Sequence, residues 1–241
     1  MLDMRQKEAL TLALDYAKSL VVFPEFSKRH FLPLPQAPLV MVHGGAGSGK
    51  SRLISSIYTM VTETLKKPGD NPDCPYVLLT AFTGSAASNI NGQTMHTTFS
   101  FKFGTSYLSM PEKQREEKRA LFQNVRMVII DEISLISSDM LYNIDLRLRE
   151  ITGKMDVVFG GVSVFCFGDL YQIKPTKAHY VFQEPCNKEH AVAQKLRDLW
   201  KMFKVINLEE NHRQVLFCTS FTLTFITSVL YSSNACFQHE F

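Results

Sequence analysis

The sequence contains few cysteines, no low-complexity tract and little net charge, and the first two shortages each exclude a class of protein. Its five cysteines are scattered and include no CxxC pair, so neither a disulfide framework nor a zinc site is indicated and a reducing compartment is favoured. Twelve glycines and ten prolines exclude a collagen-like or linker-like chain. A net charge of +3 neither indicates nor excludes a nucleic-acid-binding protein. What remains is a globular chain, long enough for one large domain or for one domain and part of a second.

The first twenty residues lack the uninterrupted apolar run of a signal peptide, because Glu8 and Asp15 divide them. They predict a helix instead, which Asp3 can cap. The apolar face of this helix is expected to include Leu10, Leu14, Ala17 and Val21. Four prolines between residues 24 and 38 then indicate an irregular connection.

From residue 39 onward, strand patterns alternate with helical patterns. Short apolar runs without polar alternation are typical of strands buried on both faces of a parallel sheet, and they occupy residues 39–42, 76–80, 127–130, 162–167 and 205–208. Helical patterns follow Lys50 and cover 85–90 and 139–151. The alternation predicts an α/β fold with a doubly wound, mostly parallel sheet. Ligands of such sheets bind outside the carboxyl ends of the strands.

A glycine-rich segment follows the first predicted strand and has the GxxxxGK[ST] pattern. Glycines let backbone N–H groups surround phosphate oxygens, and the following helix directs its positive end at the same anion. Lys50 would reach the β- and γ-phosphates, and the Ser51 hydroxyl would ligate Mg²⁺. A plain glycine-rich turn is the alternative, and a dinucleotide-binding fingerprint fits less well because it does not require Gly-Lys-Ser. The pattern predicts a nucleotide-binding loop of Gly44, Gly45, Ala46, Gly47, Ser48, Gly49, Lys50 and Ser51.

Polar residues also follow two other predicted strands. Asp131 and Glu132 end the run at 127–130, where carboxylates without a metal or polar partner would be costly. In a nucleotide-binding protein Asp131 fits a Mg²⁺ role and Glu132 fits the base that orients water, whereas a helix-capping acid pair is the alternative. Gln172, after the run at 162–167, could sense the γ-phosphate, but its spacing alone favours a surface turn.

Together these segments resemble superfamily-1 ATP-dependent DNA helicases of the petite-integration-frequency (PIF-like) type, including relatives carried by Helitron transposons. The resemblance covers about residues 1–214 and rests on Gln6, GGAGSGKS (44–51), TAFTGSAASNINGQTMHTTF (80–99), IIDEIS (129–134), FGDLYQIKP (167–175) and LEENHRQ (208–214). It implies an N-terminal helix and adenine-side segment over 1–37 and a RecA-like P-loop ATPase domain over 38–214.

The resemblance also implies roles for individual residues. Gln6 would contact the adenine edge, Gln172 would couple the γ-phosphate to DNA binding, and Arg213 would supply a positive charge in the transition state. The ATP–Mg²⁺ core would comprise Lys50, Ser51, Asp131 and Glu132. Single-stranded DNA would be held by residues 80–101, and most directly by Thr83, Gly84, Thr94 and His96.

The residues of the DNA-binding stretch fit that role physically. Several Ser and Thr hydroxyls between residues 80 and 98 offer donors for phosphate oxygens. His96, Phe99 and Phe101 offer ring faces on which bases could stack. From the residues alone, however, Phe99 and Phe101 are better explained as core residues of a strand.

Charged residues are almost absent after residue 214, where the chain departs from the family pattern. All 26 Lys and Arg lie in 1–214, whereas 215–241 carries one charge, Glu240. We expect a divergent tail foreign to the family, from splicing, a frameshift or intron sequence, with the second RecA-like domain absent. A membrane helix, which needs about 20 apolar residues, and a strand segment are the alternatives, and the tail's many hydroxyl residues disfavour the membrane.

The sequence therefore predicts an ATP-dependent DNA helicase with 5′-to-3′ polarity by resemblance, acting in DNA repair, recombination or telomere maintenance. ATP and Mg²⁺ are the expected cofactors, and single-stranded DNA is the expected partner, together with a full-length helicase or replication and repair proteins. The chain is expected to be a nuclear or mitochondrial monomer without membrane contact, and to be unable to unwind DNA alone. The alternative is a non-catalytic ATP- and DNA-binding fragment or interfering isoform. A P-loop kinase is disfavoured, because residues 113–119 indicate a solvated helix rather than an arginine lid.

Overall fold

Six parallel strands form one sheet at the centre of the molecule. The computed structural model describes residues 2–27, 35–102, 107–172, 175, 179–183 and 196–209. The strand order is β3-β2-β4-β5-β1-β6, and each of the five neighbouring pairs is parallel. The strands are β1 (Leu39–Gly44), β2 (Val77–Ala81), β3 (Gln93–Thr94), β4 (Met127–Asp131), β5 (Ser163–Gly168) and β6 (Lys204–Leu208). The expected doubly wound α/β fold is confirmed.

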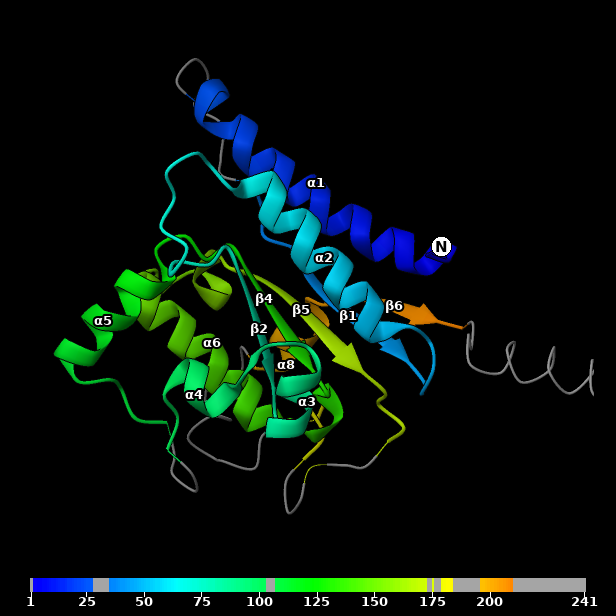
Figure 1. The fold of residues 1–241 in the computed structure, drawn as a ribbon. Coiled ribbons are helices and arrows are strands. Elements are labelled where there is room, and N and C mark those ends of the chain that lie inside the picture. Colours follow the sequence, from blue (N-terminus) through cyan, green and yellow to red (C-terminus); the bar gives the residue numbers. More distant parts are fainter. Residues whose placement is uncertain are drawn as a thin grey trace, which may run out of the picture.

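Helices cover both faces of this sheet (Figure 1). One face carries α1 (Met4–Ser27) and α2 (Lys50–Leu65), and the other carries α4 (Met95–Phe99), α5 (Glu112–Phe122) and α6 (Ser138–Thr152). Shorter elements are α3 (Gly84–Asn89), α8 (Leu196–Lys201) and the 3₁₀ turns η1 (Ile133–Leu135) and η2 (Val158–Gly161). Successive residues of the central strands point to opposite faces, so Ile129 packs with α2 whereas Ile130 packs with α6. Two-sided burial explains why these strands lack polar alternation.

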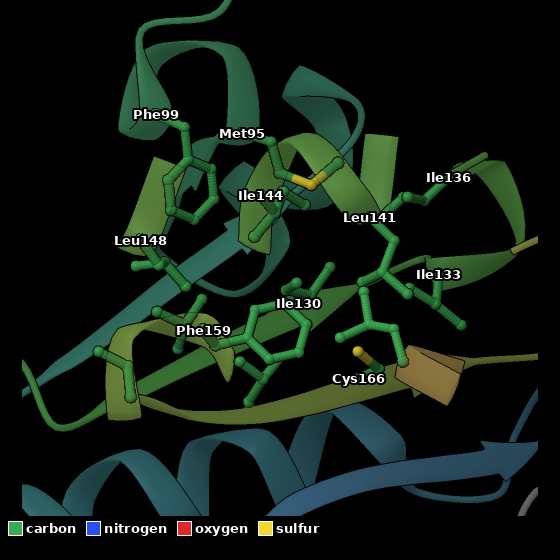
Figure 2. Close-up of a cluster of buried hydrophobic side chains, with 14 of the residues drawn as sticks. Met95, Phe99, Ile130, Ile133, Ile136, Leu141, Ile144, Leu148, Phe159 and Cys166 are labelled. Atoms are coloured by element: carbon green, nitrogen blue, oxygen red, sulfur yellow. The ribbon is translucent and has the colours of Figure 1, made fainter. Parts of the chain in front are cut away.

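The core beneath α4 and α6 fixes the position of α4 (Figure 2). Met95 and Phe99 of α4 are fully buried and belong to the same cluster as Ile144 and Leu148 of α6. The sequence favoured a strand around Phe99, which is wrong because this segment is a short helix capped by Thr94. Phe99 is nevertheless a core residue as expected, and its burial leaves no ring face on which a base could stack.

The N-terminal helix forms as predicted, but its buried face only partly coincides with the predicted one. Ala17 is buried as expected, Leu10 and Leu14 are partly buried against the core, and Val21 is 46% exposed. The buried hydrophobic face also includes Ala9, Ala13 and Tyr16, which the sequence did not single out. Small side chains let α1 lie close along α2, which is a packing preference that hydrophobicity alone does not indicate. Among the described residues no helix is both long and apolar enough to cross a bilayer. The tail at 215–241 lies outside the described residues.

Candidate functional site

Most of the predicted site residues that the structure describes follow the same ends of neighbouring strands, because every strand of the sheet runs in the same direction. Residue His43 of β1 pairs with Gly168 of β5, and Ala81 of β2 pairs with Asp131 of β4. The segments that follow these strands therefore leave from one edge of the sheet. These are the glycine-rich loop, the turn before α3, the acidic pair and the turn at 169–172. This is the edge at which doubly wound sheets bind their ligands.

The loop at 44–51 is folded around the side chain of Lys50. Lys50 Nζ donates to the carbonyls of Gly44 at 2.6 Å and Gly45 at 2.8 Å. Gly47 and Gly49 have φ of 86° and 80°, the left-handed region that favours glycine. Gly49 begins α2 without a side-chain cap, and the positive end of a helix favours an anion at such a position. A compact loop of this kind can bind phosphate.

Gln6 connects the N-terminal helix to this loop. Its backbone N–H donates to Asp3 Oδ1 at 2.7 Å, and its side-chain Oε1 accepts from the Asp3 N–H at 3.1 Å. This reciprocal pair is a capping box, so the predicted Asp3 cap is confirmed. Gln6 Nε2 also donates to the carbonyl of Ser48 at 2.9 Å, and the residue is only 1% exposed. The start of α1 is thereby fixed to the nucleotide loop.

Asp131 and Glu132 occupy the end of β4, where their environments differ. Burial raises the pKa of Asp131 and so does the Glu132 charge, whereas a hydrogen bond from the Glu132 N–H and the Lys50 charge act in the opposite direction. Glu132 has φ of 56°, an uncommon value for a residue with a side chain. Its carboxylate does not cap η1, and Ser137 caps α6. The helix-capping interpretation of the acid pair is therefore wrong.

A hydrogen bond between Thr83 and Glu132 joins two residues that the sequence placed in different roles. Thr83 Oγ1 donates to Glu132 Oε2 at 3.0 Å and also caps α3 by accepting from the Ala86 N–H at 3.2 Å. The parallel pairing of Ala81 with Asp131 brings the two residues together, since both lie just beyond adjacent strand ends. The sequence did not predict this contact, because the order of strands in the sheet was unknown.

The other predicted DNA-contacting residues lie along α3 and α4. Thr94 caps α4 by accepting from the Thr97 N–H at 3.3 Å, and Gly84 is exposed at the start of α3. The His96 ring lies 6.0 Å from Phe82, edge to face, and burial lowers the pKa of His96. The lowered pKa favours the neutral imidazole, which can stack on a base or hydrogen-bond to it.

The turn after β5 lies beside the nucleotide loop. Gln172 is exposed, and its N–H donates to the carbonyl of Asp169 at 3.0 Å, so the predicted surface turn is confirmed. His43 Nδ1 accepts from the Leu170 N–H at 3.2 Å and fixes the start of the turn. A Cβ on Gly45 would lie 3.9 Å from Asp169 Oδ2, so this carboxylate, which the sequence did not single out, faces the loop. Arg213 lies outside the described residues.

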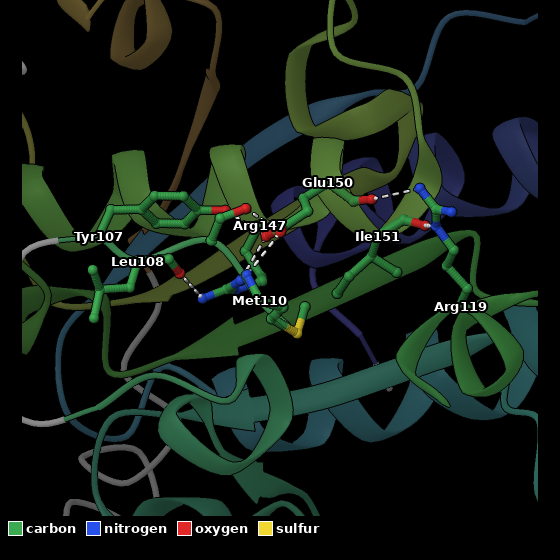
Figure 3. Close-up of polar contacts among 8 residues, drawn as sticks. Tyr107, Leu108, Met110, Arg119, Arg147, Glu150 and Ile151 are labelled. Atoms are coloured by element: carbon green, nitrogen blue, oxygen red, sulfur yellow. Dashed lines mark hydrogen bonds and ion pairs between the residues drawn. The ribbon is translucent and has the colours of Figure 1, made fainter. Parts of the chain in front are cut away.

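A buried ion pair fixes the chain that follows α4 (Figure 3). Glu150 Oε2 accepts from Arg147 at 2.6 Å and from the Tyr107 hydroxyl at 2.7 Å. Glu150 Oε1 accepts from the Ser109 hydroxyl at 2.5 Å and the Met110 N–H at 2.8 Å. Burial by itself would raise the pKa of Glu150, but these hydrogen bonds and the Arg147 charge outweigh it and lower the pKa. The network anchors residues 107–110 on α6.

Metal binding at this edge would depend on few protein ligands. Ser51 is exposed in the first turn of α2, and Asp131 is half-buried at the end of β4. Within the described part of the chain, no group of three or more His, Cys, Asp or Glu side chains could hold a metal ion.

Comparison with known sequences identifies similar proteins over most of this domain. Residues 34–222, which are 189 of the 241 residues, match the family described as PIF1-like helicase. The chain is 35% identical over 152 residues to the ATP-dependent DNA helicase PIF4 of Trypanosoma brucei brucei, covering 59% of this chain and 17% of that protein. It is 33% identical over 138 residues to the ATP-dependent DNA helicase PIF1 of Candida albicans, covering 55% of this chain and 14% of that protein. The chain thus spans less than a fifth of these relatives.

Solved structures with a similar fold include complexes with a nucleotide analogue and with DNA. A Bacteroides Pif1 in complex with ADP-AlF4 matches at 27% identity and a TM-score of 0.60, covering 88% of this chain and 43% of that chain. The Bacteroides Pif1 helicase in complex with ADP-AlF3 and ssDNA matches at 27% identity and a TM-score of 0.56, covering 88% of this chain and 42% of that chain. The sheet and its helices are therefore those of a RecA-like helicase domain.

Proposed function

The chain belongs to the PIF1-like helicase family, and from this membership we propose that it provides the ATP-hydrolysing RecA-like domain of an ATP-dependent DNA helicase that moves on single-stranded DNA. The observation that carries the proposal is the meeting of three segments at one sheet edge. These are the nucleotide loop, the Asp131–Glu132 pair and the turn at Thr83. A residue proposed to act in ATP hydrolysis, Glu132, is thereby hydrogen-bonded to one proposed to hold DNA, Thr83. The 5′-to-3′ polarity is proposed from the resemblance alone.

The residues of the site supply distinct parts of the proposed reaction. Lys50 would exchange the carbonyls of Gly44 and Gly45 for phosphate oxygens, which neutralises charge on the β- and γ-phosphates. Glu132 would orient a water molecule for in-line attack on the γ-phosphorus and accept its proton. We propose that Gln172 and Arg213 assist the reaction, as the resemblance implies.

The residues at this edge fit a Mg²⁺ ion that arrives with the nucleotide. Mg²⁺ typically uses one or two carboxylates together with phosphate oxygens, and the Ser51 hydroxyl and the Asp131 carboxylate are the ligands we propose. The ion would supply charge neutralisation on the β- and γ-phosphates.

A second function is favoured by the extent of the match. The chain covers 43% and 42% of the two Bacteroides helicases whose structures it resembles. The resemblance implies that unwinding requires the closing and opening of a cleft between two RecA-like domains. A polypeptide of these 241 residues is therefore proposed to bind ATP and DNA without unwinding duplex alone. It could then act as a non-catalytic module that occupies DNA or binds a full-length helicase.

A nucleotide-binding measurement tests the proposed ATP site directly, because both proposed functions require the chain to bind ATP. Lys50→Ala is expected to weaken binding of a fluorescent ATP analogue about tenfold or more, because a hydrogen bond to a charged group contributes roughly 1.5–3 kcal/mol. Fluorescence anisotropy in the presence of Mg²⁺ measures the affinity. Lys67→Ala, which removes an exposed lysine beyond α2, is the matched control and should bind like the wild type. Equal affinities for the wild type and Lys50→Ala would refute the nucleotide site.

A further inference from the structure

The hydroxyl of Thr83 uses all of its hydrogen-bonding capacity within the protein. A threonine hydroxyl has one proton to donate and two lone pairs with which to accept. Thr83 Oγ1 accepts from the Ala86 N–H at 3.2 Å and lies 3.3 Å from the Ser85 hydroxyl. The carboxylate of Glu132 can only accept, so the proton of Thr83 is given to Glu132 Oε2, at 3.0 Å.

A phosphate of the DNA backbone would compete for that same proton. Phosphate oxygens accept hydrogen bonds and, at neutral pH, do not donate them. The only thing the Thr83 hydroxyl can offer a phosphate is therefore the proton that Glu132 now receives. One proton cannot serve two acceptors at full strength, so contact of Thr83 with DNA and contact of Thr83 with Glu132 exclude each other.

We propose that Thr83 is a positioning residue that holds Glu132 when DNA is absent and releases it when single-stranded DNA binds. This inference rests on the proposed function, because it requires Thr83 to face a DNA phosphate and Glu132 to act on water at the γ-phosphate. DNA would then stimulate ATP hydrolysis by breaking the single hydrogen bond between Thr83 and Glu132, without any movement of the sheet.

The backbone around Glu132 suits a carboxylate with two positions. Its N–H is fixed by Asp131 Oδ1 at 2.9 Å, so the main chain stays in place when the side chain moves. Gly168 packs against the same turn, where an added Cβ would lie 2.9 Å from Ile133 Cγ2. Thr83 in turn begins α3, which is held by the Gly92 N–H donating to the Ala87 carbonyl at 2.8 Å. Only the two side chains need to reorient.

Equilibrium binding of a labelled oligothymidylate, without nucleotide, tests the competition. Removing the carboxylate in Glu132→Ala should tighten DNA binding about threefold to tenfold, because the Thr83 proton becomes available to a phosphate. The same change in a Thr83→Val background should tighten binding less than about twofold, since only the general loss of negative charge remains. Thr83→Ser retains the hydroxyl and should restore the full effect of Glu132→Ala.

Two controls separate this coupling from damage to the fold. Ser85→Ala removes a neighbouring hydroxyl that does not contact Glu132, so the effect of Glu132→Ala should persist in that background. Thr83→Val also removes the cap of α3, at a cost of about 1 kcal/mol, so each variant is checked by thermal unfolding. Should Thr83→Val fail to fold, wild-type protein with ¹³C-labelled glutamate carboxyls gives a second measurement. The resonance lost in Glu132→Ala should shift when oligothymidylate is added.

The outcomes distinguish the two proposals. A wild-type chain that does not bind oligothymidylate contradicts both the proposed function and this inference. A chain that binds it, with Glu132→Ala producing the same change whether or not Thr83→Val is also present, overturns the inference alone. An unshifted Glu132 resonance at saturating oligothymidylate overturns it as well.

Discussion

At the scale of single residues, the site depends on a few positions where another side chain would not fit. Gly92 is the clearest of these, because a Cβ there would lie 2.3 Å from the carbonyl oxygen of Leu79 in β2. Backbone atoms cannot move aside as the end of a flexible side chain can. Gly84, by contrast, has no heavy atom within 4 Å of a built Cβ. Packing therefore requires glycine at 92, whereas at 84 it leaves room for a side chain.

Gly92→Ala is expected to lower the free energy of unfolding by about 1–3 kcal/mol or more, because the added methyl must displace β2 or the turn after α3. Chemical denaturation followed by circular dichroism measures the change. Gly84→Ala is the matched control for stability and should leave the midpoint nearly unchanged. A Gly92→Ala variant as stable as the control would show that the turn after α3 adapts more easily than its packing indicates.

At the scale of elements, the helix α4, which is proposed to face DNA, is held by the core residues beneath it and by a polar network beyond its end. Phe99 is fully buried, and Lys118 of α5 donates to the carbonyls of Thr97 and Thr98 at 3.2 and 2.8 Å. The Arg147–Glu150 pair then fixes residues 107–110 on α6 (Figure 3). Because both partners of this pair are buried, losing one leaves the other charge without its partner.

Glu150→Gln is expected to destabilise the protein by about 3–5 kcal/mol at neutral pH, since it leaves Arg147 buried beside a neutral side chain. The folded-state pKa of Glu150 is lowered, so its contribution is complete above the ordinary value of 4.5 and is lost as pH falls through the folded-state pKa. Unfolding midpoints measured from neutral to acid pH should converge for wild type and variant at the acid end. A stability difference that does not change with pH would contradict a role for the Glu150 charge.

Prediction from sequence succeeded where one local pattern determines the structure and failed where distant segments determine it. Apolar runs indicated all the long strands. In β4 and β5 these runs reflect burial on both faces, whereas the edge strand β6 leaves Val205 and Asn207 exposed. The two-residue strand β3 is too short to produce a pattern, and alternating Phe99 and Phe101 suggested a strand where Thr94 starts a helix. The contact of Thr83 with Glu132 depends on β2 lying beside β4, which no local pattern encodes.

At the scale of the whole molecule, the residues proposed for catalysis and for DNA contact lie at one edge of the sheet, whereas the two helical layers provide most of the buried core. The nucleotide loop leaves β1, the acidic pair leaves β4 and the Thr83 turn leaves β2, all in the same direction (Figure 1). Changes at this edge should therefore alter binding and turnover more than folding. Substitutions in the helical layers, at Phe99 or Arg147, should lower the stability of the fold more than they alter binding or turnover.

The rate of ATP hydrolysis with and without oligothymidylate tests the central claim most directly. For the 241-residue chain with Mg²⁺, the proposed function predicts a rate that rises with oligothymidylate and falls to background in both Lys50→Ala and Glu132→Gln, each still folded by circular dichroism. The contradicting result is a wild-type rate that equals that of Lys50→Ala with and without oligothymidylate. That result would favour the second proposed function, a module that binds ATP and DNA without hydrolysing ATP.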